Sequence, residues 1–460
     1  MKITILSLLC VGSITLGAQE VATKAIKYRR SSLHMVMIED TKMPNASVIK
    51  NTFVKSPLPD KYNDHSLSAR SFFTDKYALT AEEKAAAGQK ADGKGKSAAK
   101  GMMKGLASNV TGGLVDTTNT KDLPVVIGKY LTTDNVAKNM VAKWFGRDDK
   151  GAFNMNLIGE RGSYDASALD LNKAKGSVRG MASLADAGIE LIANTFVVVT
   201  RFNYVSKKEI YDAAQRLVEA AKSSGLVKVP QTNVPLTPAM QALKDEAYKK
   251  ATEGYIVQCT SYLYQLNWND SIEAVFYNDL WMDATSADPK KKEAFDKSNL
   301  FSLKYIGDGK AFAQVPMSFK TKRSEEELVA IATQNASDAV IAKLQRDYEV
   351  FKTKTPLFSG NPITAKIGMK EGLEAGDKFE VLEQNMDEKT GKTVYKKVGK
   401  IKIMKDMIWD NRVNIGEEPV AAAPEVDKDG KPLPPKPVLN CTTFKGGSKF
   451  YSGMLIRQVK

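Results

Sequence analysis

Histidine is the side chain that most often serves as a general base, as an activator of a nucleophile or as a zinc ligand. This chain of 460 residues contains two histidines, His34 and His65. Both precede the part of the chain whose hydrophobic pattern predicts an ordered core, and the prolines between residues 51 and 70 are typical of irregular loop. The sequence therefore argues against a zinc site or a Ser-His-Asp triad.

Pairs of carboxylates are a second source of catalysis, because a glycosidase needs only two acidic side chains. Glu160, Asp270 and Asp279 are the candidates, and their spacing does not set them apart from ordinary surface carboxylates. We therefore predict no catalytic residue, no metal site and no cofactor. We expect that the protein is not an enzyme.

Aromatic residues are dense in two segments for which strands are predicted. Rows of tyrosine and tryptophan offer flat apolar area with a polar tip, which can bind sugars or partner chains. On strands such residues also pack across neighbouring strands in a core. Both interpretations stay open at this point. The candidate contact surface consists of Tyr255, Tyr262, Tyr264, Trp268, Tyr277 and Trp281.

The first 18 residues have the order of a secretory signal peptide. Lys2 gives the positive start, Ile3–Leu16 gives the apolar segment, and Gly17 with Ala18 gives a small-residue cleavage site. No later apolar run is long enough to predict a transmembrane helix. The sequence predicts an exported protein that is periplasmic or associated with the outer membrane. Cys259 and Cys441 then remain, as a disulfide or as two separate thiols.

The formal net charge of +14 favours anionic partners such as acidic glycans or lipid head groups. The lysines are spread along the chain without an aromatic-and-basic recognition motif, and an exported protein rarely meets nucleic acid. We therefore expect no nucleic-acid partner. The lysine-rich segment Lys90–Lys104 raises the alternative of a protein that binds a membrane surface.

Composition divides the chain after the signal peptide into four parts. We expect an N-terminal segment over 19–79, a flexible linker rich in Ala, Gly and Lys over 80–115, an α/β domain over 116–355 and a small β domain over 356–460. The last of these carries a proline-rich insertion at 417–438. The predicted fold class is α+β or α/β, with a mixed sheet and packed helices followed by the small β domain.

Hydrophobic periodicity and capping signals predict the individual elements. Ser324 and Glu327 have the spacing of a capping box before the longest helix. Helices are expected over Thr133–Phe145, Lys173–Ala193, Lys207–Ser224, Thr237–Glu253 and Ser324–Phe351. Strands are expected over Lys27–Asp40, Phe153–Asp165, Thr195–Thr200, Gly254–Trp268 and Ser271–Met282, and in a hairpin of Leu300–Ile306 and Ala311–Phe319.

The segment Ile367–Val381 (IGMKEGLEAGDKFEV) and the later Val398–Ile403 (VGKIKI) alternate apolar residues with glycine-containing turns. This pattern resembles the C-terminal SH3-like domain of flagellar assembly protein T and of related envelope proteins. The resemblance covers residues 362–404. It implies that the small β domain is an SH3-like barrel.

Upstream, Phe196–Ile210 (FVVVTRFNYVSKKEI) and Tyr255–Leu263 (YIVQCTSYL) are similar to the curli-secretion channel protein family, with Val197–Val199 and Arg201 carrying the likeness. Several stretches are also similar to exported proteins of Bacteroidetes-type bacteria. These resemblances imply an assembly component of the cell envelope without catalytic residues. We therefore expect a non-catalytic exported protein whose partners are other envelope proteins, with glycan binding or glycan processing as the second hypothesis.

Overall fold

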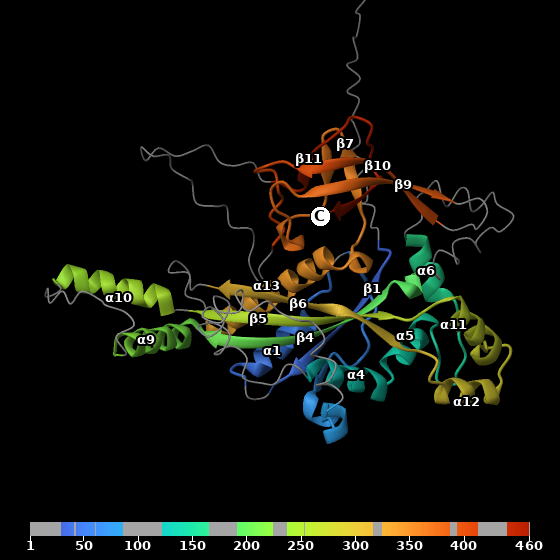
Figure 1. Cartoon of the computed structure of the whole chain (residues 1–460). Helices are drawn as coiled ribbons and strands as arrows, with labels where there is room; N and C mark the ends of the chain where they lie inside the picture. Colours follow the sequence, from blue (N-terminus) through green and yellow to red (C-terminus); the bar gives the residue numbers. More distant parts are fainter. Residues whose placement is uncertain are drawn as a thin grey trace, which may run out of the picture.

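The computed structural model describes residues 29–40, 43–59, 61–85, 122–164, 191–223, 237–252, 254–315, 324–386, 393–412 and 439–459. Within them the chain forms a mixed sheet with packed helices and a separate closed barrel (Figure 1). This architecture confirms the predicted mixed α and β class. The predicted signal peptide, most of the expected linker, most of the expected helix Lys173–Ala193 and the proline-rich insertion lie outside the described residues.

The sheet has six strands, with the order β2-β1-β4-β5-β6 and β3 paired to β1. Strands β2, β3 and β4 run parallel to β1, whereas β4, β5 and β6 are antiparallel neighbours. The sheet is therefore mixed. Its strands are β1 (Ser32–Glu39), β2 (Asn63–Asp64), β3 (Ser71–Phe73), β4 (Thr195–Ser206), β5 (Tyr255–Leu266) and β6 (Leu303–Val315).

Strand β1 lies inside the sheet, although the sequence places its segment ahead of the ordered core. Its register pairs Ser32 with Thr195, far along the chain. Leu33 packs on one face of the sheet and Val36 on the other, and both are fully buried. Such a pairing between distant segments leaves no local signal. Helix α1 (Ala46–Lys55) follows and buries Ile49 and Phe53. Its second half lies in the segment 51–70, where irregular loop was expected.

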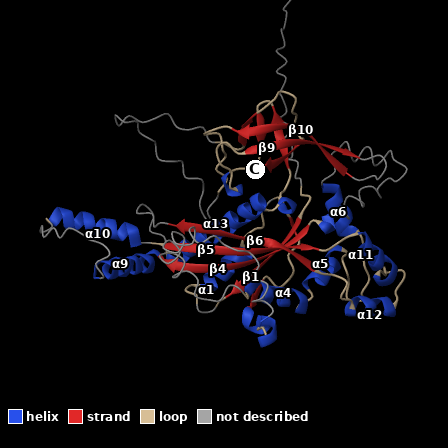
Figure 2. Cartoon of the chain, in the orientation of Figure 1, coloured by secondary structure: helices blue, strands red, loops and turns tan. Residues whose placement is uncertain are grey.

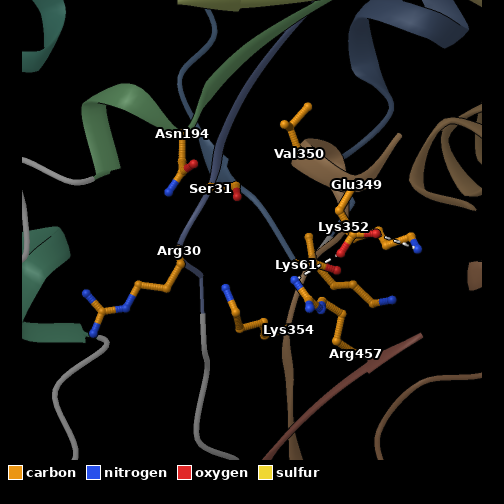
Figure 3. Close-up of a pocket in the computed structure, with 10 residues that line it drawn as sticks. Arg30, Ser31, Lys61, Asn194, Glu349, Val350, Lys352, Lys354 and Arg457 are labelled. Atoms are coloured by element: carbon orange, nitrogen blue, oxygen red, sulfur yellow. Dashed lines mark ion pairs between the residues drawn. The ribbon is translucent and has the colours of Figure 1, made fainter. Parts of the chain in front are cut away.

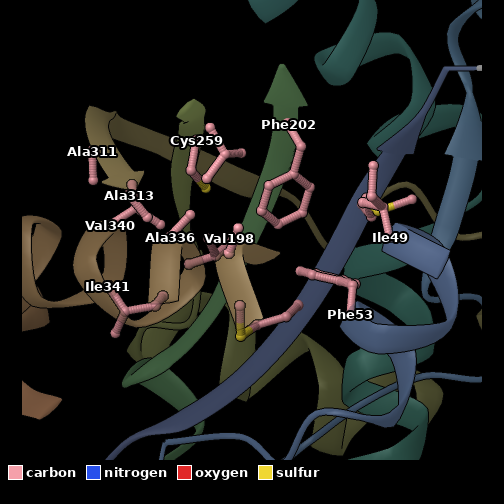
Figure 4. Close-up of a cluster of buried hydrophobic side chains, with 14 of the residues drawn as sticks. Ile49, Phe53, Val198, Phe202, Cys259, Ala311, Ala313, Ala336, Val340 and Ile341 are labelled. Atoms are coloured by element: carbon pink, nitrogen blue, oxygen red, sulfur yellow. The ribbon is translucent and has the colours of Figure 1, made fainter. Parts of the chain in front are cut away.

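One face of the sheet is covered by α1 and by the long helix α13 (Glu325–Asp347). The predicted capping box is confirmed, because Ser324 accepts from the Glu327 amide and Glu327 accepts from the Ser324 amide. Figure 4 shows Val340 of α13 beside Ala313 of β6. Full burial of a side chain such as Val340 stabilises the fold by about 1.5–3 kcal/mol.

The opposite face is covered by α4 (Leu123–Thr133) and α5 (Val136–Trp144), which pack on β1, β4 and β5. Beyond the end of the sheet, four short helices gather around an aromatic cluster (Figure 2). These helices are α6 (Asn156–Tyr164), α11 (Asp270–Val275), the π-helical turn η2 (Phe276–Leu280) and α12 (Pro289–Lys297).

The strands predicted over Phe153–Asp165 and Ser271–Met282 are wrong, because both segments are largely helical. In the second, the Asn269 side chain accepts from the amides of Ser271 and Ile272 and starts the helix. Ile272, Phe276 and Leu280 then recur every four residues and are all buried. The β-branched and aromatic composition had favoured a strand, but the helical spacing and the cap prevail.

The predicted hairpin around Gly307 and Gly309 is also wrong. Strand β6 runs through both glycines without turning and stays paired with β5. A Cβ on Gly307 would lie 2.2 Å from the Tyr348 hydroxyl, and one on Gly309 would lie 3.0 Å from Leu344 Cδ2. The glycines therefore allow α13 and its C-terminal end to approach the strand closely, rather than allowing the chain to reverse.

The barrel is closed, with six antiparallel strands in the order β10-β11-β8-β7-β12-β9. Its interior buries Leu357, Val381 and Ile401 among other apolar side chains. β10 and β11 are paired neighbours, so the proline-rich insertion connects two adjacent strands. The strands are β7 (Thr355–Gly360), β8 (Ile363–Ala365), β9 (Lys378–Met386), β10 (Thr393–Ile403), β11 (Thr442–Lys445) and β12 (Leu455–Val459).

The C-terminal half of α13 contacts the barrel at the turn η4 (Met369–Glu371). Arg346 donates to the Gly372 carbonyl at 3.0 Å. Gly372 has φ 69°, a left-handed conformation that glycine adopts without strain. The turn η3 (Glu349–Phe351) follows α13, and its Glu349 pairs with Arg457 of β12 at 3.0 Å. These contacts hold the barrel against the end of the helix.

The closed barrel leaves no room for a side chain at Gly360, so a substitution there should destabilise the fold. A Cβ there would lie 1.9 Å from the backbone oxygen of Phe450, which cannot rotate away. We expect Gly360→Ala to lower the free energy of unfolding by about 2 kcal/mol or more. The matched control is Gly128→Ala in α4, where a Cβ meets nothing within 4 Å. This variant should have a free energy of unfolding about 0.5–1 kcal/mol higher, because alanine has the greater helix propensity. Chemical denaturation measures both, and equal stability of Gly360→Ala and the native chain would contradict the barrel packing.

Candidate functional site

The aromatic residues that the sequence offers as a contact surface are mostly interior. Tyr262, Tyr264 and Trp268 are 5%, 4% and 7% exposed. Both tyrosines pack on the face covered by α4 and α5, in one cluster with Ile127 and Met140. Of the two interpretations that the sequence leaves open, core packing describes these three side chains. The side chain of Tyr255 lies outside the described residues.

Tyr277 and Trp281 are partly buried beside the aromatic cluster at the end of the sheet. Trp281 stacks on Phe153 with ring centroids 5.5 Å apart, and Tyr277 directs its hydroxyl toward the sulfur of Met155. Both rings thus complete a core. The described side chains of the aromatic row therefore do not form an open platform, and the glycan hypothesis stays a prediction.

The two histidines are fully buried, and their expected place in a poorly ordered segment is wrong. His65 stacks on Trp144 at 4.9 Å, and its Nε2 lies 2.9 Å from the Met140 carbonyl. Its Nδ1 lies 3.0 Å from an Arg161 nitrogen. Because arginine only donates, Nδ1 accepts and Nε2 carries the proton that is donated to Met140.

Arg161 of α6 is the centre of this cluster. It donates to Ser32 Oγ at 3.1 Å and to the Asp64 carbonyl at 2.6 Å, and its guanidinium lies 4.5 Å from the Trp144 ring centroid. Burial lowers the pKa of Arg161 to about 10, so it remains a cation at neutral pH. The cluster ties α5 and α6 to the start of β1. This role is structural, and its hydrogen bonds connect elements that are far apart in sequence.

Burial lowers the pKa of both histidines to about 3, with the charges of Arg70 near His34 and of Arg161 near His65 adding to the effect. Both imidazoles are therefore neutral from weakly acid to alkaline pH. They lack the near-neutral pKa that favours general acid–base catalysis. Within the described residues, no group of three or more His, Cys, Asp or Glu side chains could hold a metal ion.

These pKa shifts predict a loss of stability in acid. The folded pKa values lie below the ordinary 6.5, so the unfolded chain takes up protons first as the pH falls. The stabilisation is complete above about pH 6.5 and declines toward about pH 3. We expect His34→Gln to reduce the pH slope of the unfolding free energy by about 1.4 kcal/mol per pH unit in this window.

The matched control for this slope is Thr200→Ala, which alters a buried hydrogen bond to Ser261 without removing a titrating group. Its stability curve should run parallel to that of the native chain. Denaturant titrations between pH 4 and pH 7 provide the measurement. If the curves of His34→Gln and the native chain were parallel as well, the histidine assignment would be wrong.

Cys259 and Cys441 are free thiols. Cys259 is fully buried in the core beneath α13, and burial raises the pKa of its thiol to about 12. Cys441 is partly exposed next to β11. Of the two alternatives left by the sequence, the structure has separate thiols.

Two helices that were predicted, α9 (Lys207–Ser223) and α10 (Pro238–Thr252), pack beside each other, and nearly all described side chains of α10 are exposed. They form an arm that projects beyond the ends of β4, β5 and β6 (Figures 1 and 2). The helices pack on each other, with the rings of Tyr211 and Tyr248 5.1 Å apart. On α10, Met240 and Leu243 are 49% and 67% exposed. The arm is the candidate contact surface that the sequence did not predict. The exposure of Met240 and Leu243 depends on tertiary packing, which hydrophobic periodicity does not reveal.

No protein-family model matches the sequence, and no curated protein matches it. In the described part of the chain, no helix combines the length and apolarity needed to cross a membrane. The segment Lys90–Lys104, which the membrane-surface hypothesis requires, lies outside the described residues. The fold and surface define a two-unit protein with an α/β body, a closed barrel and a projecting helical arm.

Proposed function

We propose that this protein is a non-catalytic, exported component of the cell envelope that acts in assembly or scaffolding by binding other envelope proteins. Its signal-like N-terminus supports export to the periplasm or the outer-membrane periphery. The six-stranded barrel is compatible with the SH3-like assignment. Small barrels of this kind suit binding, because their closed sheet rigidly supports the loops between strands.

The observation that carries the proposal is the exposed arm of α9 and α10. Leu243 and Met240 lie on α10 and remain 67% and 49% exposed. Exposed apolar side chains grouped on one element mark protein–protein contact sites more often than isolated ones do. A partner that covers this helix with an apolar groove would bury both side chains and stabilise the complex.

The barrel provides the second requirement of a scaffold, which is a rigid connection between binding elements. α13 lies across the sheet and contacts the barrel through Arg346, so the arm and the barrel belong to one framework. The arm leaves the sheet through β4 and β5, which are paired along their whole length. A partner bound to the arm is thereby held at a fixed distance from one bound to the barrel.

Site-specific photo-crosslinking in the native cell tests this proposal. A photoreactive residue at Leu243 and one at Met240 should each crosslink to the same envelope protein. The matched control is Val394 on β10, which is 43% exposed but belongs to the barrel. A shared partner at both arm positions and its absence at Val394 is the expected result. Equal crosslinking at all three positions, or none at the arm, would refute the proposal.

Leu243→Glu should abolish the Met240 crosslink while leaving the fold intact. Because Leu243 is 67% exposed, the free energy of unfolding should change by less than about 0.5 kcal/mol. A charge at the centre of an apolar contact should weaken binding by about tenfold or more. Val394→Glu serves as the control and should leave the crosslink unchanged. If the crosslink survived in Leu243→Glu, α10 would not be the contact.

A further inference from the structure

A cavity of about 290 Å³ opens between the sheet and the barrel. Its walls come from the segment before β1, the residue before β4, the turn η3 with the linker that follows it, and strand β12 (Figure 3). Both units therefore contribute to it, and it is remote from the arm. Five cationic side chains line the cavity, namely Arg30, Lys61, Lys352, Lys354 and Arg457.

Glu349 is the one carboxylate among the described residues that line this cavity. It pairs with Lys352 at 2.8 Å and with Arg457 at 3.0 Å. The Lys352 side chain is 8% exposed and the Glu349 side chain is 61% exposed, so this ion pair runs from the interior to the solvent. The nearby Lys352 and Arg457 cations hold the pKa of Glu349 below its ordinary value. Glu349 thus pairs with both Lys352 and Arg457, and the residues that line the cavity carry more positive than negative charge.

Arg457 is already engaged by protein groups. Its Nε lies 2.7 Å and its Nη2 2.6 Å from Glu380 Oε1, while Nη1 pairs with Glu349. The guanidinium fork is consequently directed at two carboxylates of the protein. It orients the wall of the cavity rather than presenting a free fork for a planar carboxylate ligand.

Lys61 and Lys354 approach the cavity from different elements. Lys61 precedes β2, and no carboxylate of the described residues lies within ion-pair distance of its ammonium group. Burial lowers the pKa of Lys61, and the more distant Glu371 opposes this shift only in part. The Lys354 ammonium lies 4.0 Å from the Tyr395 ring centroid, which fixes its position. An anion between these lysines would favour the charged form of Lys61.

We propose that this cavity binds a phosphate group of a small ligand or of a lipid head group. A phosphate carries up to two negative charges on tetrahedral oxygens, so ammonium groups that approach from several directions match it better than they match a planar carboxylate. Ser31, Thr353 and Asn194 supply hydroxyl and amide groups at the rim. The volume lies at the lower limit for small-molecule sites, which fits a phosphorylated monosaccharide or pyrophosphate. This site is independent of the proposed role of the arm.

Calorimetric titration of the full chain with inorganic pyrophosphate tests the site. The double variant Lys61→Gln/Lys354→Gln should bind pyrophosphate at least about tenfold more weakly than the native protein. Lys310→Gln on β6 is the control for the loss of one positive charge, and its dissociation constant for pyrophosphate should stay within about twofold of the native value. Lys354→Arg keeps the charge and should also retain binding. Thermal unfolding of each variant checks that the fold is preserved.

Vesicles distinguish the two sources of the phosphate group. Phosphatidic acid in phosphatidylcholine vesicles presents a phosphomonoester on a membrane, whereas pure phosphatidylcholine does not. Binding to the first vesicles, competed by pyrophosphate and lost in the double variant, assigns a lipid head group; binding of pyrophosphate alone assigns a soluble ligand. Failure of the native protein to bind either probe overturns the proposal. Binding that is unchanged in the double variant also overturns it, since adventitious contact with surface lysines would then explain the signal.

Discussion

Helix α13 packs along the sheet and ends against the barrel, and most of the architecture depends on this placement. Its apolar side contacts β5 and β6, where Gly307 and Gly309 leave room for the end of the helix. In its last turns, Arg346 donates a hydrogen bond to the Gly372 carbonyl of the barrel. The chain then continues directly through η3 into the linker that lines the cavity. A shift of this helix would therefore change the sheet contact, the domain contact and the cavity together.

Two arginine side chains connect segments of the protein that are distant in sequence. Arg161 joins α6 to β1 and β2 beneath the ring of Trp144. Arg457 joins β12 of the barrel to η3 of the body through Glu349. Arg161 is buried, so the removal of one of its hydrogen-bond partners would leave a guanidinium donor unsatisfied away from solvent. The Arg457–Glu349 pair is more exposed, with side chains that are 31% and 61% accessible. These contacts specify how the elements are arranged in addition to contributing stability.

The sequence predicted the elements whose signals are local. β4 follows from a β-branched run at Thr195–Thr200, and α13 follows from its cap and its apolar repeat. The sequence could not show that β1 pairs with β4, because that register joins residues separated by a long intervening chain. For the same reason it misjudged His34 and His65, whose burial comes from α5 and α6. Gly307 predicted a hairpin turn, but glycine also occurs where two elements pack closely. The arm was predicted as helices, but its exposure was not, since amphipathic spacing does not say which face finds a partner.

The cavity follows from the same framework, since it exists only while α13 holds the barrel beside the start of β1. Hydrogen exchange of the full chain with and without pyrophosphate tests whether both units form the cavity. Residues 29–34 and 349–355 belong to the body and its linker, and residues 455–459 belong to the barrel. We predict that pyrophosphate slows exchange in all three segments at the same concentration. Protection confined to one unit, with the other unaffected at saturation, would contradict it.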